Sequence, residues 1–176
     1  ASIGDGINAT KVPNLYTQTL EWKSESYSQV AGGIGTIFEF FGAILGGFLA
    51  DRIGRKETII IGFGGFGIIA IIFGFFLPEY SHSENFLSAY LILPPFFRAL
   101  GLVAIFSLCM NISWTKSAAT MFTCYMAISN ISTTIGTKTA APLDNIVSCP
   151  NHLFIAVGIF SIIPLLIIYF INFNKK

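Results

Sequence analysis

Charged residues are scarce in this sequence. Asp, Glu, Lys and Arg together make up 11% of its 176 residues, whereas soluble domains usually carry about 25%. Hydrophobic residues account for 53%, and Phe alone occurs 18 times. An apolar surface of this size is hidden more easily by lipid than by a single folded core. The shortage of charge therefore excludes an ordinary soluble domain.

Groups that bind metals, cofactors or nucleic acids are also few. The net charge is +1, so the chain lacks the basic surface that nucleic-acid binding requires. The cysteines Cys109, Cys124 and Cys149 are odd in number and have no CxxC spacing, which indicates apolar fillers. His82 and His152 fall in loops. We expect no cofactor, no metal, no nucleic-acid partner and no enzymatic activity, since a membrane enzyme needs clustered His, Cys or acidic residues.

Long apolar stretches are what the sequence has in abundance. A helix that crosses a bilayer needs about 20 mostly apolar residues, and no loop is long enough to form a soluble domain. Segment 1–20 is polar, with Asp5, Asn8 and Lys11, and is either a loop or the truncated end of a helix that lines a cavity. We predict an all-α integral membrane protein with five to six transmembrane helices. The other spans are expected at 29–50, 58–77, 86–110, 117–142 and 153–171.

The basic residues predict the orientation of these spans. Basic loops face the cytoplasm in most membrane proteins. Arg52, Arg55 and Lys56 follow the span 29–50, Lys116 precedes the span 117–142, and the tail ends in two lysines. If every span crosses once, these regions share one side and the acidic loops share the other. We therefore expect an integral protein of the inner cell membrane with a cytoplasmic C-terminus.

One stripe of the span 29–50 combines small residues with a carboxylate. Gly32, Gly35, Gly42 and Gly46 recur at helical spacing together with Glu39. The glycines favour close helix packing, which places Glu39 against protein or a water-filled cavity. Burial disfavours the charged form of a carboxylate, which suits a residue that takes up and releases protons. The alternative is a neutral or paired Glu39 with a structural role.

Arg98 lies at similar depth in the span 86–110. Arginine stays charged, so within a membrane it must be paired or hydrated. It either pairs with Glu39 or binds an anionic group of a substrate. Pro94 and Pro95, one turn earlier, predict a kink in this helix.

The span 117–142 is amphipathic within the membrane. Thr123, Asn130 and Thr134 share one face of the expected helix. A few hydroxyls are tolerated anywhere in a span because they can bond the helix's own carbonyls. This many on one sector indicates either the wall of an aqueous path or a polar contact between helices.

The loop after the span 29–50 carries the most specific motif. It reads Gly-Phe-Leu-Ala-Asp-Arg-Ile-Gly-Arg-Lys over residues 47–56, which resembles the G-x-x-x-D-R-x-G-R-K signature of the major facilitator superfamily at every defining position. In that family the acid and its basic neighbours form a latch that stabilises one state of the transport cycle. The resemblance implies this role for Gly47, Asp51, Arg52, Gly54, Arg55 and Lys56.

The resemblance also implies a missing partner. Family transporters have twelve spans in two six-helix halves, and this chain supplies at most six. Residues 117–130 resemble span eleven of the muropeptide-permease and acetyl-coenzyme-A-transporter branch, although Met121 replaces a Gln of that pattern. Since the chain starts with Ala and stops directly after its last span, we expect a fragment, the C-terminal half. Without the N-terminal half it is not expected to transport.

By this resemblance the protein is a secondary active transporter that moves a small solute by alternating access within a lipid bilayer. Proton symport is expected, with Glu39 and Asp5 as candidate carriers. Asn8, Arg98, Thr123, Asn130 and Thr134 are further candidates for the solute and proton pathway. The alternative is a membrane receptor or assembly subunit that uses the same fold without transporting.

Overall fold

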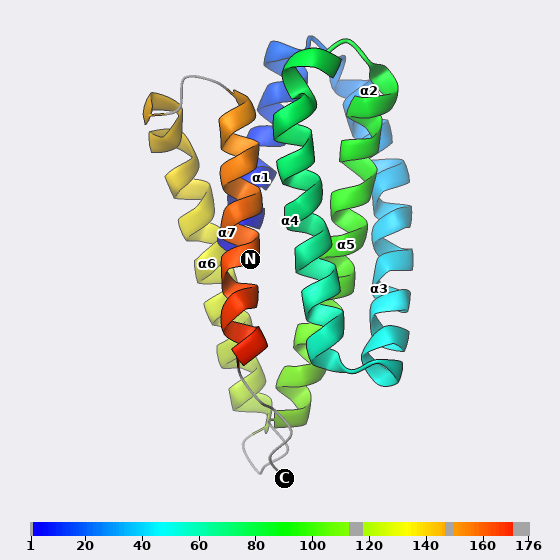
Figure 1. The fold of residues 1–176 in the computed structure, drawn as a ribbon, viewed down its shortest axis with the longest axis vertical. Helices are drawn as coiled ribbons and strands as arrows, with labels where there is room; N and C mark the ends of the chain where they lie inside the picture. Colours follow the sequence, from blue (N-terminus) through cyan, green and yellow to red (C-terminus); the bar gives the residue numbers. More distant parts are fainter. Residues whose placement is uncertain (1, 113–117, 147–149, 171–176) are drawn as a thin grey trace.

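The computed structural model describes residues 2–112, 118–146 and 150–170, and they are helical almost throughout (Figure 1). No strand occurs within these ranges. Lys116, Cys149 and the terminal lysines lie outside the described residues. The elements in chain order are α1 (Ser2–Asn14), the π-helix η1 (Leu15–Thr19), α2 (Ser24–Ser28), the π-helix η2 (Gln29–Ile34), α3 (Gly35–Arg52), α4 (Arg55–Tyr80), α5 (Glu84–Ile112), α6 (Ala118–Ile146) and α7 (Pro150–Phe170).

Four of the described helices are long and apolar enough to cross a membrane. They are Ser24–Arg52, Arg55–Tyr80, Glu84–Asn111 and Asn151–Ile168. The polar helices α1 and α6 do not meet the same requirement, because α1 is short and carries charges, and α6 is rich in Ser and Thr. The prediction of an all-α membrane fold is confirmed. The helices extend a few residues past one or both ends of the expected spans, for example to Ser24 and Arg52 around 29–50.

The helices pack in a reciprocal pattern (Figure 1). The long helices form two triplets in chain order, the first made of α1, α3 and α4 and the second of α5, α6 and α7. The first helix of each triplet packs on the second and third helices of the other triplet. Thus α1 lies against α6 and α7, and α5 lies against α3 and α4. The third helices, α4 and α7, pack on each other and join the two groups.

Glycines permit the closest of these contacts. A Cβ at Gly42 would collide with the carbonyl oxygen of Phe96 on α5, and one at Gly46 would lie 2.7 Å from that of Leu100. On the other side of the bundle, Gly136 of α6 faces Gly6 of α1. By contrast, nothing lies within 4 Å of a Cβ at Gly32. The glycine stripe expected on α3 therefore serves helix packing, except at its first member.

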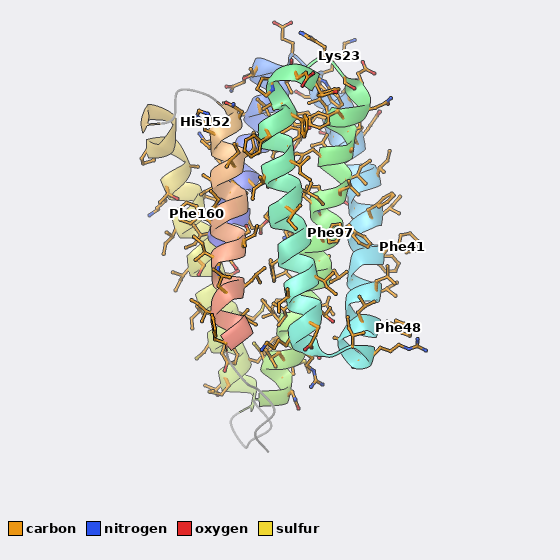
Figure 2. The ribbon with its side chains drawn as sticks, viewed as in Figure 1. Lys23, Phe41, Phe48, Phe97, His152 and Phe160 are labelled. Atoms are coloured by element: carbon orange, nitrogen blue, oxygen red, sulfur yellow. The ribbon has the colours of Figure 1, made fainter. Side chains whose placement is uncertain are left out.

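Helix α4 is more buried than its apolar sequence indicates. Its sequence is apolar on all sides, yet among the four apolar helices it buries the largest share of its residues. The reason is that α4 packs between α5 and α7. Phe75 of α4 still lies 66% exposed, and Phe41 and Phe48 of α3 point away from the bundle (Figure 2). Such rings are suited to contact with lipid tails.

Two π-helical turns flank the connection between α1 and α3. They are η1 and η2, on either side of residues 20–28. π-turns are rare and often lie at functional positions. Between them Glu21 has φ of 54°, unusual for a residue other than glycine. The backbone N–H of Trp22 donates to the backbone carbonyl of Tyr16 at 2.9 Å. No feature of the sequence predicted these turns.

Candidate functional site

Three charged side chains from three helices meet in the bundle. Arg98 of α5 donates to the carboxylate of Glu39 on α3, and its other terminal nitrogen lies 3.5 Å from Asp5 of α1. The three side chains are partly buried, with exposed fractions of 29% for Arg98, 25% for Asp5 and 36% for Glu39. We call Asp5, Glu39 and Arg98 the charge triad.

The local sequence explains why the triad forms at this depth. Glu39 lies near the middle of the continuous helical span Ser24–Arg52, and Arg98 lies near the middle of α5. The contacts of Gly42 and Gly46 hold α3 directly against α5. The sequence left open whether Arg98 pairs with Glu39 or binds substrate. In the structure Arg98 forms an ion pair with Glu39. Asp5 as a second partner of Arg98 was not predicted, because the sequence does not reveal how α1 is placed.

Side chains, more than backbone packing, connect α1 with α5. The two helices approach closely at very few points in the described structure. Besides the ion pair of Asp5 with Arg98, the hydroxyl of Tyr90 donates to the side-chain oxygen of Asn8 at 2.6 Å, and the hydroxyl of Tyr16, in the adjoining η1, donates to the carbonyl of Leu87 at 2.7 Å. We call this set of contacts the polar seam. Tyr90 and Tyr16 were not predicted, although Tyr90 shares a helix face with Arg98, two turns away.

Aromatic packing fixes Tyr90, one of the two tyrosines of the polar seam. Tyr90 is 4% exposed, and its ring stacks on Phe73 of α4 with centroids 3.7 Å apart. Phe154 of α7 meets both rings edge-on. Such contacts restrict the ring to one orientation, so the hydroxyl of Tyr90 is held toward Asn8.

The predicted polar face of α6 lies apart from the triad. Thr123, Asn130 and Thr134 are exposed, and the hydroxyls of Thr123 and Thr134 donate to carbonyls of their own helix at 2.9 Å. The side of α6 that contacts α1 instead carries Gly136 and the backbone of Thr133. One face of α6, with the small residue Gly136, therefore packs on α1, and a second face, with the polar residues Thr123, Asn130 and Thr134, is exposed.

The signature loop joins α3 to α4 at one end of the bundle (Figure 1). Asp51 is exposed, Arg52 lies over the ring of Phe48 at 5.0 Å, and Arg55 donates its Nε–H to the hydroxyl of Ser107 on α5 at 2.8 Å. Gly47 and Lys56 are half-buried. The bond to Ser107 ties the loop to the helix that carries Arg98.

Gly54 gives this loop its backbone conformation, with φ of 109° and ψ of 152°. Such values are accessible almost only to glycine and cost another residue about 1–3 kcal/mol. A side chain there would also collide with Glu57.

We expect Gly54→Ala to lower the unfolding temperature in detergent, measured by tryptophan fluorescence. In Gly64→Ala the new methyl lies 3.6 Å from Leu165, so an equal loss there would contradict this explanation.

Metal-binding groups are not gathered anywhere in the described part of the chain. No three His, Cys, Asp or Glu side chains within it could hold a metal ion together. Cys109 is buried and Cys124 exposed, and both are free thiols. The charge triad is therefore the candidate site with the clearest chemistry.

One comparison with known proteins gives a match. The family model described as Major Facilitator Superfamily matches residues 1–175. No curated protein and no solved structure matches the chain. The match spans all the helices described above and includes both the signature loop and the charge triad.

Proposed function

Because the chain belongs to the Major Facilitator Superfamily, whose members are membrane transporters, we propose that it is part of a secondary active transporter that moves a small solute by alternating access with proton coupling. The observation that carries the proposal is the charge triad. Two carboxylates share one guanidinium, and two of the three side chains, Glu39 and Arg98, lie near the middle of candidate membrane spans.

The physical case rests on the cost of charge at this depth. Ionisable residues within membrane helices are expensive, and they commonly mark ion or proton pathways. Protonation of one carboxylate removes its attraction to Arg98, which changes how strongly α1, α3 and α5 are held together. An event that stabilises one arrangement of helices over another shifts the population between states. The triad thereby provides a link between proton binding and helix movement.

The open face of α6 fits a role beside the transport path. Thr123, Asn130 and Thr134 lie exposed in a helix that would otherwise contact lipid. We propose that this face and the triad line a cavity completed by an N-terminal half. The signature loop would then lie on the cytoplasmic side, with Asp51 and its basic neighbours as a latch.

Neutralising Glu39 tests this proposal. In proteoliposomes that contain the full-length protein, Glu39→Gln should flatten the dependence of solute uptake on external pH, because one of the two carboxylates can no longer take up a proton. Glu79→Gln makes the same change on an exposed residue and should leave the dependence intact. Proton coupling through the triad is refuted if uptake by Glu39→Gln keeps the original pH profile.

A further inference from the structure

Tyr90 is the residue at which α5 meets three other helices. Its hydroxyl donates to the side-chain oxygen of Asn8 on α1, its ring stacks on Phe73 of α4, and Phe154 of α7 meets that ring edge-on. Both phenylalanines are buried, with at most 2% of their surface exposed. Rings packed in this way keep one orientation, so the hydroxyl of Tyr90 is a fixed point against which α1 is placed.

Asn8 passes this placement on to Asp5. The two residues are three positions apart in α1, so their side chains lie on one face of the helix, about one turn from each other. On α5, Tyr90 and Arg98 likewise share a face, about two turns apart. The face of α1 that meets Tyr90 is therefore the face from which Asp5 reaches Arg98.

The contact between Asp5 and Arg98 is sensitive to the position of α1. Oδ2 of Asp5 lies 3.5 Å from Nη1 of Arg98, which is at the long end of hydrogen-bonding distances. The other terminal nitrogen of Arg98 makes a closer contact with Glu39 of α3. Because Arg98 is engaged on that side, a small movement of α1 away from α5 ends the contact with Asp5.

The other contacts of α1 do not replace the bond to Tyr90. Its glycines pack on α6 and α7, which places α1 relative to those two helices. Tyr16 of η1 donates to a carbonyl of α5, but Pro13 lies between Tyr16 and Asn8. Proline has no N–H and interrupts the hydrogen bonds of a helix, so the contact of Tyr16 fixes the segment before Pro13 less firmly. Of the polar-seam contacts other than the ion pair, the bond of Asn8 lies closest to Asp5 along the chain.

From these contacts we propose that Tyr90 is a positioning residue: through Asn8 it holds α1 where Asp5 pairs with Arg98. The inference rests on the proposed function, in which the charge triad binds the coupled proton. Tyr90 itself transfers no proton in this scheme. Without its hydroxyl, Asp5 loses attraction from Arg98, and this loss favours the protonated form of a carboxylate. Asp5 should then bind a proton at higher pH.

The charged groups around Asp5 make such a change readable. Arg98 and the amino terminus attract its carboxylate, and Glu39 repels it. The parts of α6 and α7 that pack on α1 beside Asp5 are residues 133–137 and 157–161, which contain no charged side chain and no histidine, cysteine or tyrosine. Basic residues outside these segments are Lys11 of α1, Lys138 of α6 and His152 of α7. A change in proton binding caused at Tyr90 therefore reports the contact of Asp5 with Arg98.

Infrared titration of the full-length protein in lipid vesicles tests the proposal and requires no solute. A protonated carboxyl group has its own C=O stretching band, and the band that disappears in Asp5→Asn belongs to Asp5. Tyr90→Phe removes the hydroxyl but keeps the ring. We expect it to raise the midpoint pH of this band by about one unit, the lower end of the effect of a neighbouring arginine. An unchanged midpoint, or no band that depends on Asp5, overturns the inference.

Further variants separate positioning from a general loss of packing. Asn8→Leu removes the same hydrogen bond from the other side and should raise the midpoint equally. The double variant with Tyr90→Phe should raise it no further, because the two changes remove one shared bond. Tyr16→Phe removes the other tyrosine bond of the polar seam and should lower the unfolding temperature without moving the midpoint. Tyr80→Phe alters an exposed tyrosine and should change neither. An additive shift in the double variant, or an equal shift in Tyr16→Phe, contradicts the proposal.

The result is independent of the test of the proposed function. If Tyr90→Phe leaves the midpoint of Asp5 unchanged but Glu39→Gln flattens the pH dependence of uptake, the proposed function stands without this inference. If Tyr90→Phe moves the midpoint but Glu39→Gln keeps the pH profile, Tyr90 positions Asp5 in a protein that is not proton-coupled through the triad.

Discussion

Replacing Arg98 by Met is expected to remove most of the folded protein from the membrane. The substitution leaves Asp5 and Glu39 facing each other without a cation. Removing one partner of a fully buried ion pair typically costs about 3–5 kcal/mol. The triad is 25–36% exposed, so the loss should be smaller, yet it remains a sizeable part of the stability of most proteins. The measurement is the amount of monodisperse full-length protein after extraction, together with its unfolding temperature.

A compensating variant decides the cause of this loss. In the triple variant Asp5→Asn, Glu39→Gln, Arg98→Met the triad carries no charge, and hydrogen bonding between the two amides remains possible. We expect it to recover stability but not proton-dependent uptake. If the triple variant is as unstable as Arg98→Met, the side chain of Arg98 matters for its packing, and the charge argument fails.

Replacing Gly42 by Leu is the second change with a large expected effect. Even a single methyl at this position collides with the backbone of Phe96, so the larger side chain must push α3 away from α5. Overpacking of a close contact costs about 1–3 kcal/mol, and here it also separates Glu39 from Arg98. We expect a lower unfolding temperature and loss of uptake.

Gly32 provides the matched control for this change. It belongs to the same predicted stripe, but nothing lies within 4 Å of its Cβ position. Gly32→Leu should therefore unfold close to the temperature of the unmodified protein. Equal destabilisation by the two variants would show that helix contact is not the reason for the effect at Gly42.

Hydropathy and spacing predicted which residues are helical, because both depend on short stretches of sequence. They also identified Glu39 and Arg98, since a charge within an apolar span is visible without a structure. They did not predict that Asp5 joins them. Its helix is too polar to be recognised as a span, and the periodicity of a helix defines its faces but not the helix that each face meets.

The two π-turns and the burial of α4 were missed for related reasons. π-turns are rare single turns within α-helices, and neither hydropathy nor helical spacing distinguishes them from the α-helix around them. The apolar sequence of α4 is compatible with lipid or protein on any side, and only its position between α5 and α7 decides. Likewise Thr123 and Thr134 were assigned to a polar face, but their surroundings outside this chain stay a prediction.

The reciprocal packing of the helices constrains how the protein is made. α1 is synthesised before the other helices, yet its packing partners α6 and α7 come at the end of the chain. With Asp5 and Asn8 it is also poorly suited to enter lipid by itself. Its Arg98 partner becomes available only after α3 and α4 have been inserted. We therefore expect α1 to complete its insertion into the membrane only after α6 and α7 have emerged.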